Sequence, residues 1–498
     1  MKKFVCLITV LLIFSPARSQ DTFLNIYDST KLFRARDIAF NDWGDIFVCA
    51  NARENDEPNI NNYILKLDSN GNLLNSWWEK KSDLFLAECS NIQFIDNEVY
   101  LFGYIDSYYP VQYHPGIFMK KFDEQLSEVR NYDFFIDGDV HRGINHTCRV
   151  RHHEDKFIFF TSLYLNDPLI RIRPGYFELT KDGQLLNFVF DPELVFWHIH
   201  YDFLFKPDNQ GFYTFMLEHT PSVPISGWIY DYDFKLENRA YHQIPNYFNK
   251  FFTALPIDDE LIYLAGSYRE PMPFINEQVG VMKMTLDGTA LITYLFEPLM
   301  DSTSYPALYN SLDVLSDGSL IFCSSYGLED YNYFANGTPT WISLFKFTPD
   351  LELIWHKFIG DGGSFEAHCM RVSHSDEIVI AGGYNPVPPQ SPYIRSLMIM
   401  KTNSDGLITG IDDETTAFAT TEAILFPNPA GDFAIVDFSL QYKTATLQLL
   451  DFAGRTVFER ALTANHQQVD ISGVPAGAYV YRIFDSKGLE EGGKLVVE

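Results

Sequence analysis

Apolar residues are grouped along most of this chain in short runs that polar turns separate, and this pattern predicts β-strands rather than helices. Residues 98–105 (EVYLFGYI) and 377–384 (EIVIAGGY) are typical of the most apolar runs, and each follows a turn that contains an aspartate. Strands that are buried on both faces have such continuous apolar runs, and Asp and Gly favour the backbone of tight turns. The pattern therefore predicts an all-β protein.

A unit of about 56 residues recurs along the first four fifths of the chain. It contains a short apolar strand, a turn with Asp, a strongly apolar strand and a second turn that is rich in Asp and Gly. The aspartates of the first turn recur at intervals of 50 to 59 residues, at Asp42, Asp96, Asp155, Asp208, Asp258, Asp317 and Asp376. One such unit cannot bury both faces of its sheet, whereas radial packing of several sheets can. Seven copies over residues 20–410 predict a seven-bladed β-propeller.

The two ends of the repeat region complement each other. Residues 22–27 form a strand pattern without a repeat of their own, and the last repeat stops just after Asp405 and Gly406. We predict that residues 22–27 supply the missing strand of the last blade and close the ring. A linear β-solenoid is the alternative, although solenoid repeats are usually shorter and stricter. The region resembles secreted bacterial propellers whose loosely conserved repeats end in a Lys-x-Asp-x-x-Gly-x-Leu turn.

The first 19 residues have the organisation of a secretory signal peptide. Lys2 and Lys3 precede an apolar run over residues 4–14, and Ala17-Arg18-Ser19 places small residues at positions −3 and −1 of a cleavage site. The run is too short to span a bilayer, and no later run approaches the roughly 20 residues that a spanning helix needs. We expect residues 1–19 to be removed on export through the periplasm and the mature chain to have no transmembrane segment.

A separate module follows the repeats. Residues 411–421 are polar, acidic and without period, which predicts a linker, and residues 422–498 contain six or seven short strand patterns of a small immunoglobulin-like β-sandwich. Four motifs mark this module. They are Pro427-Asn428-Pro429 with Gly431, Asp451 with Gly454 and Arg455, Gly477 with Tyr479, and the terminal Lys494-Leu495-Val496-Val497.

With these four motifs in order, the module closely resembles the type A C-terminal sorting domain that cargo of the type IX secretion system carries in Bacteroidota. The resemblance implies that the module binds the type IX translocon and that it is commonly removed after export. It also implies that the protein is secreted or attached at the outer cell surface. We expect the terminal strand and the Asn428 turn to be exposed for recognition and Tyr479 to lie in the core. An ordinary immunoglobulin-like stalk or carbohydrate module is the alternative.

Charge and cysteine content exclude several classes of function. The chain has 66 Asp and Glu against 37 Lys and Arg, a formal net charge of −29, which repels phosphate backbones and anionic lipid headgroups. We therefore expect no nucleic-acid partner. The five cysteines that follow residue 19 are irregularly spaced and form no CxxC motif, so they are interpreted as small buried hydrophobes.

The sequence contains no recognised catalytic or cofactor motif, since GxSxG, HExxH, the P-loop and the Rossmann fingerprint are all missing from it. His198 and His200 would share one face of a strand, but no third metal ligand is placed by spacing. Residues 68–72 (DSNGN) have the composition of a calcium loop without the distant Glu of an EF-hand. We expect no cofactor, with calcium as the alternative.

The loops between the second and third strands of the units vary most, and several are rich in tyrosine. Variable loops at one rim of a rigid scaffold are where ligands bind. The candidate ligand-binding residues in these loops are Tyr108, Tyr109, Tyr113, Tyr331 and Tyr333. The pattern favours a binding module for a glycan or a surface protein. The alternative is a polysaccharide hydrolase or lyase with acidic residues near the central channel, although no catalytic carboxylate pair stands out.

Overall fold

The computed structural model describes a large part of the chain. The described residues are 22–27, 31–54, 60–79, 86–106, 115–136, 141–144, 148–165, 172–191, 197–220, 223–236, 239–245, 248, 250–269, 277–296, 303–328, 339–360, 363–386, 395–408, 424–437, 445–451, 455–464, 466–485 and 490–497. Within them the elements are β-strands and none is a helix, as the sequence predicts. The signal peptide predicted for residues 1–19 and the linker predicted for residues 411–421 lie outside the described residues.

The described strands between residues 23 and 402 form seven antiparallel sheets of four or five strands. The first three sheets contain β2 (Lys31–Phe40), β3 (Ile46–Glu54), β4 (Ile60–Leu67) and β5 (Leu73–Glu79); β6 (Leu86–Ile95), β7 (Glu98–Asp106), β8 (Gly116–Asp123) and β9 (Glu128–Phe135); and β10 (His141–Ile144), β11 (Arg149–His153), β12 (Lys156–Leu165), β13 (Ile172–Thr180) and β14 (Leu185–Phe190).

The fourth, fifth and sixth sheets repeat this order. They contain β15 (Trp197–Phe205), β16 (Gly211–Thr220), β17 (Val223–Asp233) and β18 (Arg239–Gln243); β19 (Lys250–Pro256), β20 (Leu261–Arg269), β21 (Glu277–Thr285) and β22 (Ala290–Phe296); and β23 (Thr303–Pro306), β24 (Leu312–Val314), β25 (Leu320–Leu328), β26 (Trp341–Phe347) and β27 (Leu353–Ile359). The seventh contains β28 (Ser364–Val372), β29 (Ile378–Asn385), β30 (Ser396–Thr402) and β1 (Phe23–Tyr27).

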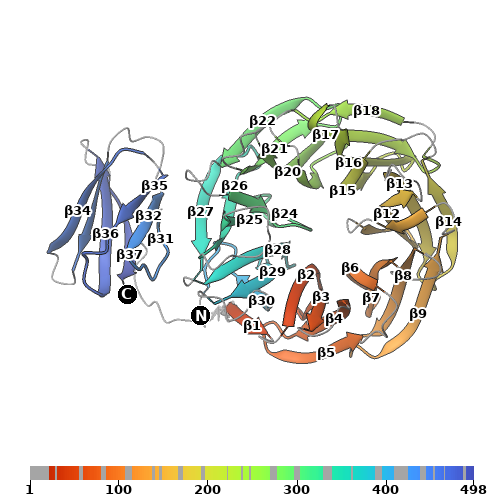
Figure 1. Ribbon diagram of the computed structural model, residues 1–498, viewed down its shortest axis with the longest axis horizontal. Coiled ribbons are helices and arrows are strands. Elements are labelled where there is room, and N and C mark those ends of the chain that lie inside the picture. The colour runs from red at the N-terminus through yellow and green to blue at the C-terminus, as the bar shows by residue number, and fades with distance from the viewer. Residues whose placement is uncertain are drawn as a thin grey trace, which may run out of the picture.

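Figure 1 shows these sheets arranged in a ring, with the first strand of each unit toward the centre and the last toward the periphery. The arrangement is propeller-like. Both predicted turns occur where the repeat places them, and the first turn joins the first two strands of a sheet. Several residues of the first turn have positive φ angles, at Asp96, Asn97, Glu154, Asn209 and Asp376. Asn and Asp adopt this backbone more readily than most other residues, and Asp96 and Asp376 are the two recurring aspartates that do so. Asp208, Asp258 and Asp317 instead accept a hydrogen bond from the backbone N–H two residues further on.

The predicted closure of the ring by the N-terminal strand is confirmed. β1 pairs with β30 in antiparallel register, from Phe23 opposite Lys401 to Tyr27 opposite Leu397. The Phe23 side chain is 8% exposed and packs in a hydrophobic cluster that contains residues of the first and seventh sheets. Its ring covers the turn at Gly71, where φ is +80° and an added Cβ would lie 2.7 Å from the ring. β1 therefore belongs to the seventh sheet and also packs on the first.

Polar side chains of the inner strands bind each sheet to the next one around the ring. Backbone amides of the following sheet donate to side-chain oxygens in five cases: Ile92 to Asp37, Val150 to Asn91, Ala254 to Asp202, Ser311 to Thr253 and Val372 to Asp313, over 2.9–3.4 Å. Arg149 Nε donates to the carbonyl oxygen of Tyr201 at 2.7 Å, which joins the third sheet to the fourth. Arg371 of the seventh sheet forms an ion pair with Asp37 of the first at 3.2 Å. Every neighbouring pair of described sheets is therefore joined near the axis.

The described residues from 424 onward form two further sheets around a core of their own. One contains β31 (Ile424–Phe426), β32 (Phe433–Asp437) and β35 (His466–Asp470), and the other contains β33 (Ala445–Leu450), β34 (Thr456–Leu462), β36 (Gly477–Asp485) and β37 (Glu490–Val497). Buried residues of both sheets, such as Val436 and Leu447, belong to one hydrophobic cluster. The described part of this two-sheet domain contains seven short strands, in agreement with the six or seven that the sequence predicts.

The cysteines are buried and free, as predicted. Cys49, Cys89, Cys148, Cys323 and Cys369 form no disulfide with one another. Burial raises the pKa of Cys148 to about 12, although a hydrogen bond with Ser90 acts in the opposite direction. A thiol with such a pKa is not reactive at neutral pH, so these side chains act as small hydrophobes.

We predict that Phe23→Ala weakens the closure of the ring. The buried ring contacts two sheets, and phenylalanine-to-alanine changes in cores cost about 3 kcal/mol or more. Ile26→Ala on the same strand is the matched control, because Ile26 is 40% exposed. Urea unfolding of the full chain measures both changes. Equal losses of unfolding free energy in the two variants would contradict the role assigned to Phe23.

Candidate functional site

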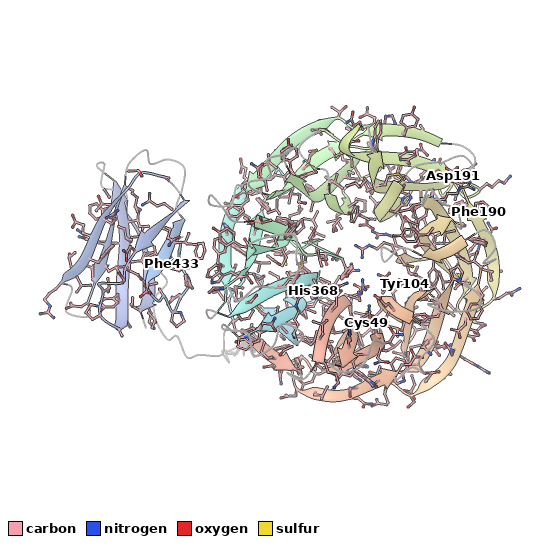
Figure 2. The ribbon with its side chains drawn as sticks, viewed as in Figure 1. Cys49, Tyr104, Phe190, Asp191, His368 and Phe433 are labelled. Carbon is pink, nitrogen blue, oxygen red and sulfur yellow. The ribbon has the colours of Figure 1, made fainter. Side chains whose placement is uncertain are left out.

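A cluster of buried charged and aromatic side chains lies at one end of the inner strands, and we call it the axial cluster. Its members come from the first, second, sixth and seventh sheets and their connections: Arg36, Glu88, Tyr104, Tyr309, Glu366, His368 and Arg395. Figure 2 shows Tyr104 and His368 at the inner wall of the ring.

The strand register shows which end of the ring this is. Glu88 of β6 lies opposite Tyr104 of β7, and Glu366 of β28 lies opposite Gly383 of β29. These pairs stand near the start of the inner strand and the end of the second strand. The second strands β7 and β29 end, and the third strands β8 and β30 begin, at that same end. The axial cluster therefore lies at the end where the sequence predicts the ligand-binding loops.

Arg36 occupies a bulge in β2, where the register with β3 shifts between Ala35 and Asp37. Its side chain is buried and forms an ion pair with Glu88. It also donates to the hydroxyl of Tyr309 at 2.6 Å, and its guanidinium carbon lies 4.6 Å from the centre of that ring. Burial lowers the pKa of Arg36, but Tyr309 and Glu88 raise it by more, so the guanidinium stays charged. Arg36 thus fixes both the Glu88 carboxylate and the Tyr309 ring.

Tyr104 remains a neutral hydroxyl beside this pair. Burial raises the pKa of Tyr104 well above its ordinary value, and the negative charge of Glu88 raises it further. Asn51 Nδ2 donates to Glu88 at 3.2 Å. The Glu88 carboxylate therefore accepts hydrogen bonds from Arg36 and Asn51.

His368 has a defined tautomer. The backbone N–H of Ala35 donates to His368 Nδ1 at 3.1 Å, so in the neutral ring the proton is on Nε2. That nitrogen lies 3.4 Å from Glu366 Oε2, and Arg395 forms an ion pair with the same oxygen. Burial lowers the pKa of His368, although the nearby Glu366 charge opposes this effect. The ring is therefore neutral at physiological pH.

Glu366 is held as a carboxylate. Burial is the largest influence and raises the pKa of Glu366, but Arg395, His368 and Arg34 together lower it by more, and the net pKa lies below the usual value. A general acid at neutral pH needs a raised pKa instead. The arrangement suits fixed hydrogen-bonding groups and charges better than proton transfer.

Asp313 is an inner-strand carboxyl with the opposite shift. Burial raises its pKa, and the charge of Arg371 opposes the rise only in part. Its two oxygens accept backbone N–H groups of Val314 and Val372, each at 2.9 Å. Asp313 therefore joins the sixth sheet to the seventh and is not presented to a ligand.

The predicted tyrosines of the ligand loops, Tyr108, Tyr109, Tyr113, Tyr331 and Tyr333, lie outside the described residues. The flanking aromatic residues Tyr104 and Tyr326 are buried. Sequence reasoning missed the axial cluster, although a signal was present. Charged residues interrupt otherwise apolar inner strands at residues 32–38 (LFRARDI) and 364–370 (SFEAHCM).

His198 and His200, for which the sequence offers no third metal ligand, both lie on β15. His200 is buried on β15, and its ring packs edge-on against Phe160 with 4.5 Å between ring centres; the side chain of His198 is outside the described part. Among the described residues, no group of three or more His, Cys, Asp or Glu could hold a metal ion. In the candidate calcium turn, Asp68 accepts hydrogen bonds from Asn70 and Asn72 within the turn, over 2.8–2.9 Å. The calcium alternative stays a prediction.

In the C-terminal domain, the first and last of the four motifs meet. Asn428 Nδ2 donates to the Lys494 carbonyl at 2.9 Å, and the Val496 amide donates to Asn428 Oδ1 at 2.8 Å. Ala430 N–H donates to the Val496 carbonyl at 2.7 Å. The Pro427-Asn428-Pro429 turn therefore holds the terminal strand, and the Asn428 side chain itself is exposed as predicted.

The remaining motif residues divide between turn and core. Arg455 donates to Asp451 through its backbone and its side chain at 2.9 and 2.7 Å, and Gly454 between them is outside the described residues. Tyr479 is 7% exposed in the domain core, as predicted, and its hydroxyl donates to Pro475 O. The expectation that the terminal strand is exposed is wrong for Leu495 and Val497. Both side chains face the core, because alternate residues of a strand point to opposite faces.

Comparison with known proteins agrees with this domain. Residues 424–498 match the family model of the secretion system C-terminal sorting domain. The C-terminal domain is therefore a sorting domain, and the protein is one that is exported to the cell surface or secreted. No curated protein matches the chain. Within the described residues, the structure has no helix that could cross a membrane.

Several solved structures are similar to the chain at low identity. Drosophila Semaphorin 2a is 8% identical with a TM-score of 0.46, over 96% of this chain and 97% of that one. The β-propeller domain of the Trilobed protease from Pyrococcus furiosus is 11% identical with a TM-score of 0.39, over 78% and 99%. The endo-arabinase of Bacteroides thetaiotaomicron is 10% identical with a TM-score of 0.32, over 63% and 94%. Likeness at this level carries no argument about activity.

We predict that His368→Asn flattens the pH dependence of stability below about pH 6.5. The pKa of His368 is lowered in the folded chain, so below pH 6.5 the unfolded chain binds a proton that the folded chain does not. Stability therefore falls as the pH falls, by at most about 1.4 kcal/mol per pH unit for this group. Asn can keep the acceptor for Ala35 N–H but does not titrate. Urea unfolding across this range measures the slope.

The control for this measurement is His374→Asn, since His374 is exposed in a turn of the seventh sheet. The control is expected to keep the slope of the unchanged protein. An unchanged slope in His368→Asn would show that the buried ring does not resist protonation.

Proposed function

We propose that the protein is an exported seven-bladed β-propeller whose loop rim binds an extracellular glycan or surface protein, with a C-terminal domain that directs export by the type IX translocon. The observation that carries the binding proposal is the axial cluster. Its charges are paired and buried at the end of the ring where the predicted ligand loops begin. Such a cluster gives that end of the ring a fixed shape.

The ring of inter-sheet bonds supports the seven-bladed architecture. Each of the seven described sheets is bonded to the next, and the seventh is bonded to the first. A linear solenoid has no contact between its first and last repeats. The common core of the two C-terminal sheets likewise supports the immunoglobulin-like sandwich.

Binding is favoured over hydrolysis by the state of the carboxylates. The pKa of Glu366 is lowered beside Arg395, and Glu88 is held in an ion pair by Arg36. Hydrolysis of a glycosidic bond uses one carboxylic acid as a proton donor and a second as base or nucleophile. Tyr309 is half-buried against Arg36, which holds its aromatic ring in place. Aromatic rings held in this way suit contact with sugars or with protein side chains.

We predict retention without turnover when the full chain is screened against extracellular polysaccharides and a glycan array. Binding of a ligand with no release of reducing ends or unsaturated products is the expected result. Release of products that depends on Glu88 or Glu366 would favour the hydrolase or lyase alternative. The matched variants are Glu88→Gln and Glu366→Gln, since each keeps the shape of its side chain.

The export proposal rests on the sorting domain and on the signal-peptide pattern of residues 1–19, which supports passage through the periplasm of a member of the Bacteroidota. The exposed Asn428 turn and Lys494 are the proposed contact for the translocon. Deletion of residues 422–498 is expected to leave the propeller in the periplasm. Measurement of the protein in periplasm and medium tests this prediction, and normal amounts of the truncated chain in the medium would contradict it.

A single substitution tests the role of the Asn428 turn in export without removing the folded domain. Asn428→Ala removes two hydrogen bonds to the terminal strand, each worth about 1 kcal/mol. Export is expected to fall while the domain still folds. Val480→Ala is the control, because Val480 is 42% exposed and lies outside the four motifs. Equal export of the two variants would contradict the role of the turn.

A further inference from the structure

The sorting domain has a second apolar face, which lies opposite its own core. In β31, Leu425 packs in the core of the domain, whereas the next residue, Phe426, belongs to a hydrophobic cluster that contains residues of the fifth and sixth sheets. In β32, Ala434 and Val436 pack in the domain core, and Ile435 between them belongs to the same propeller cluster as Phe426. The sheet of β31 and β32 is therefore apolar on both faces.

This second face is covered by the propeller. Phe426 is 2% exposed and Ile435 is 4% exposed, and Phe433 packs beside them. Figure 1 shows the sorting domain next to β27, and Figure 2 shows Phe433 on the side of the domain that faces the ring. Phe426 and Ile435 do not belong to the hydrophobic core that holds the two sheets of the sorting domain together.

Phe426 sits among three aromatic residues of the sixth sheet. Its ring stacks on Phe358 of β27, with 3.5 Å between ring centres and an angle of 18°. It meets Trp341 and Tyr326 nearly edge-on, at 6.2 Å and 74° and at 6.0 Å and 79°. Phe426 therefore fills a site that Phe358, Trp341 and Tyr326 form, with one ring stacked on it and two at its edge.

The position of this site relates it to the predicted ligand loops. Tyr326 is near the end of β25 and Trp341 begins β26, so they flank the connection that contains Tyr331 and Tyr333. The sorting domain therefore covers the base of one of the loops that the sequence marks for ligand binding.

We propose that the sorting domain acts as a cap on the propeller in addition to directing export. Phe426 occupies an aromatic site on the sixth sheet of the propeller, and loss of the sorting domain opens that site to ligand. The statement that a ligand later enters rests on the proposed function, whereas the capping contact does not. Exposed patches of this kind mark binding sites and also promote aggregation, so a cap that is kept until export protects the chain in transit.

The first test measures the exposure of Trp341, which is 5% exposed in the full chain. Phe426→Ala is expected to raise oxidation of Trp341 in hydroxyl-radical footprinting at least threefold, because it removes the ring that covers it. Unfolding of the sorting domain should be nearly unchanged, since Phe426 is not in its core. Val457→Ala, at a residue that is 41% exposed, is the control and should leave the footprint unchanged.

Leu425→Ala distinguishes loss of the cap from loss of the fold. The two residues are neighbours in β31 but face opposite sides, so Leu425→Ala should lower the unfolding midpoint of the sorting domain. Unchanged oxidation of Trp341 in Phe426→Ala would overturn the proposal. An equal loss of domain stability in Phe426→Ala would overturn it as well, because Phe426 would then be a residue of the domain's own core.

The second test needs no ligand. A protease site placed in residues 411–421 of the full chain allows cleavage after folding. The two fragments are expected to elute together on size exclusion, and those of Phe426→Ala to elute apart. Separation of the unchanged fragments would overturn the cap. If the fragments stay together but the propeller alone binds no glycan or surface protein, the cap stands and the proposed function fails.

Discussion

The contact between the first and seventh sheets is the constraint on which the rest of the structure depends. β1 pairs with β30, Arg371 pairs with Asp37, and Ala35 N–H donates to His368 Nδ1. The last two contacts join residues that are more than 330 positions apart in the chain. This closure brings the two halves of the axial cluster together, since Arg36 belongs to the first sheet and Glu366 and His368 belong to the seventh. An open array of the same sheets would keep the Arg36–Glu88 and Glu366–Arg395 pairs but would lose the bonds from Arg36 to Tyr309 and from Ala35 N–H to His368.

Burying the charges of the axial cluster costs free energy, and the need to offset this cost explains how the charges are paired. A buried charge is tolerated when a partner of opposite charge and further hydrogen bonds satisfy it. Arg36 has Glu88 and the Tyr309 hydroxyl, and Glu366 has Arg395 beside it. Simpler bonds, such as that from Ser311 N–H to Thr253, would suffice to join the sheets. The extra charges at this end of the axis are paired and buried, and they fix the positions of the strands and of Tyr309 there.

The sequence was sufficient for features that depend on neighbouring residues. The repeat, both turns and the buried cysteines follow from local patterns, and the pairing of residues 22–27 follows from the incomplete last repeat. Contacts between distant residues were not accessible in this way. Arg36 and Glu366 are visible as charges in apolar strands, but only the register and the closed ring bring their neighbourhoods together. The terminal strand is a second case in which the sequence alone was not sufficient. Lys494-Leu495-Val496-Val497 is recognisable as a motif, but its alternation between core and solvent depends on its pairing with β36.

The sorting domain carries a pattern that connects its fold to the propeller. Residues 424–426 (ILF) and 433–436 (FAIV) are apolar without alternation, which is typical of strands that are buried on both faces. A free two-sheet domain buries only one face of each sheet, so the second apolar face requires a partner. The sixth sheet supplies it through Phe358. Asn428 is two residues from Phe426 and is bonded to the terminal strand, so the proposed recognition turn adjoins the docking contact in the chain. Engagement of the proposed recognition turn and release of Phe426 would therefore involve the same short segment of the chain.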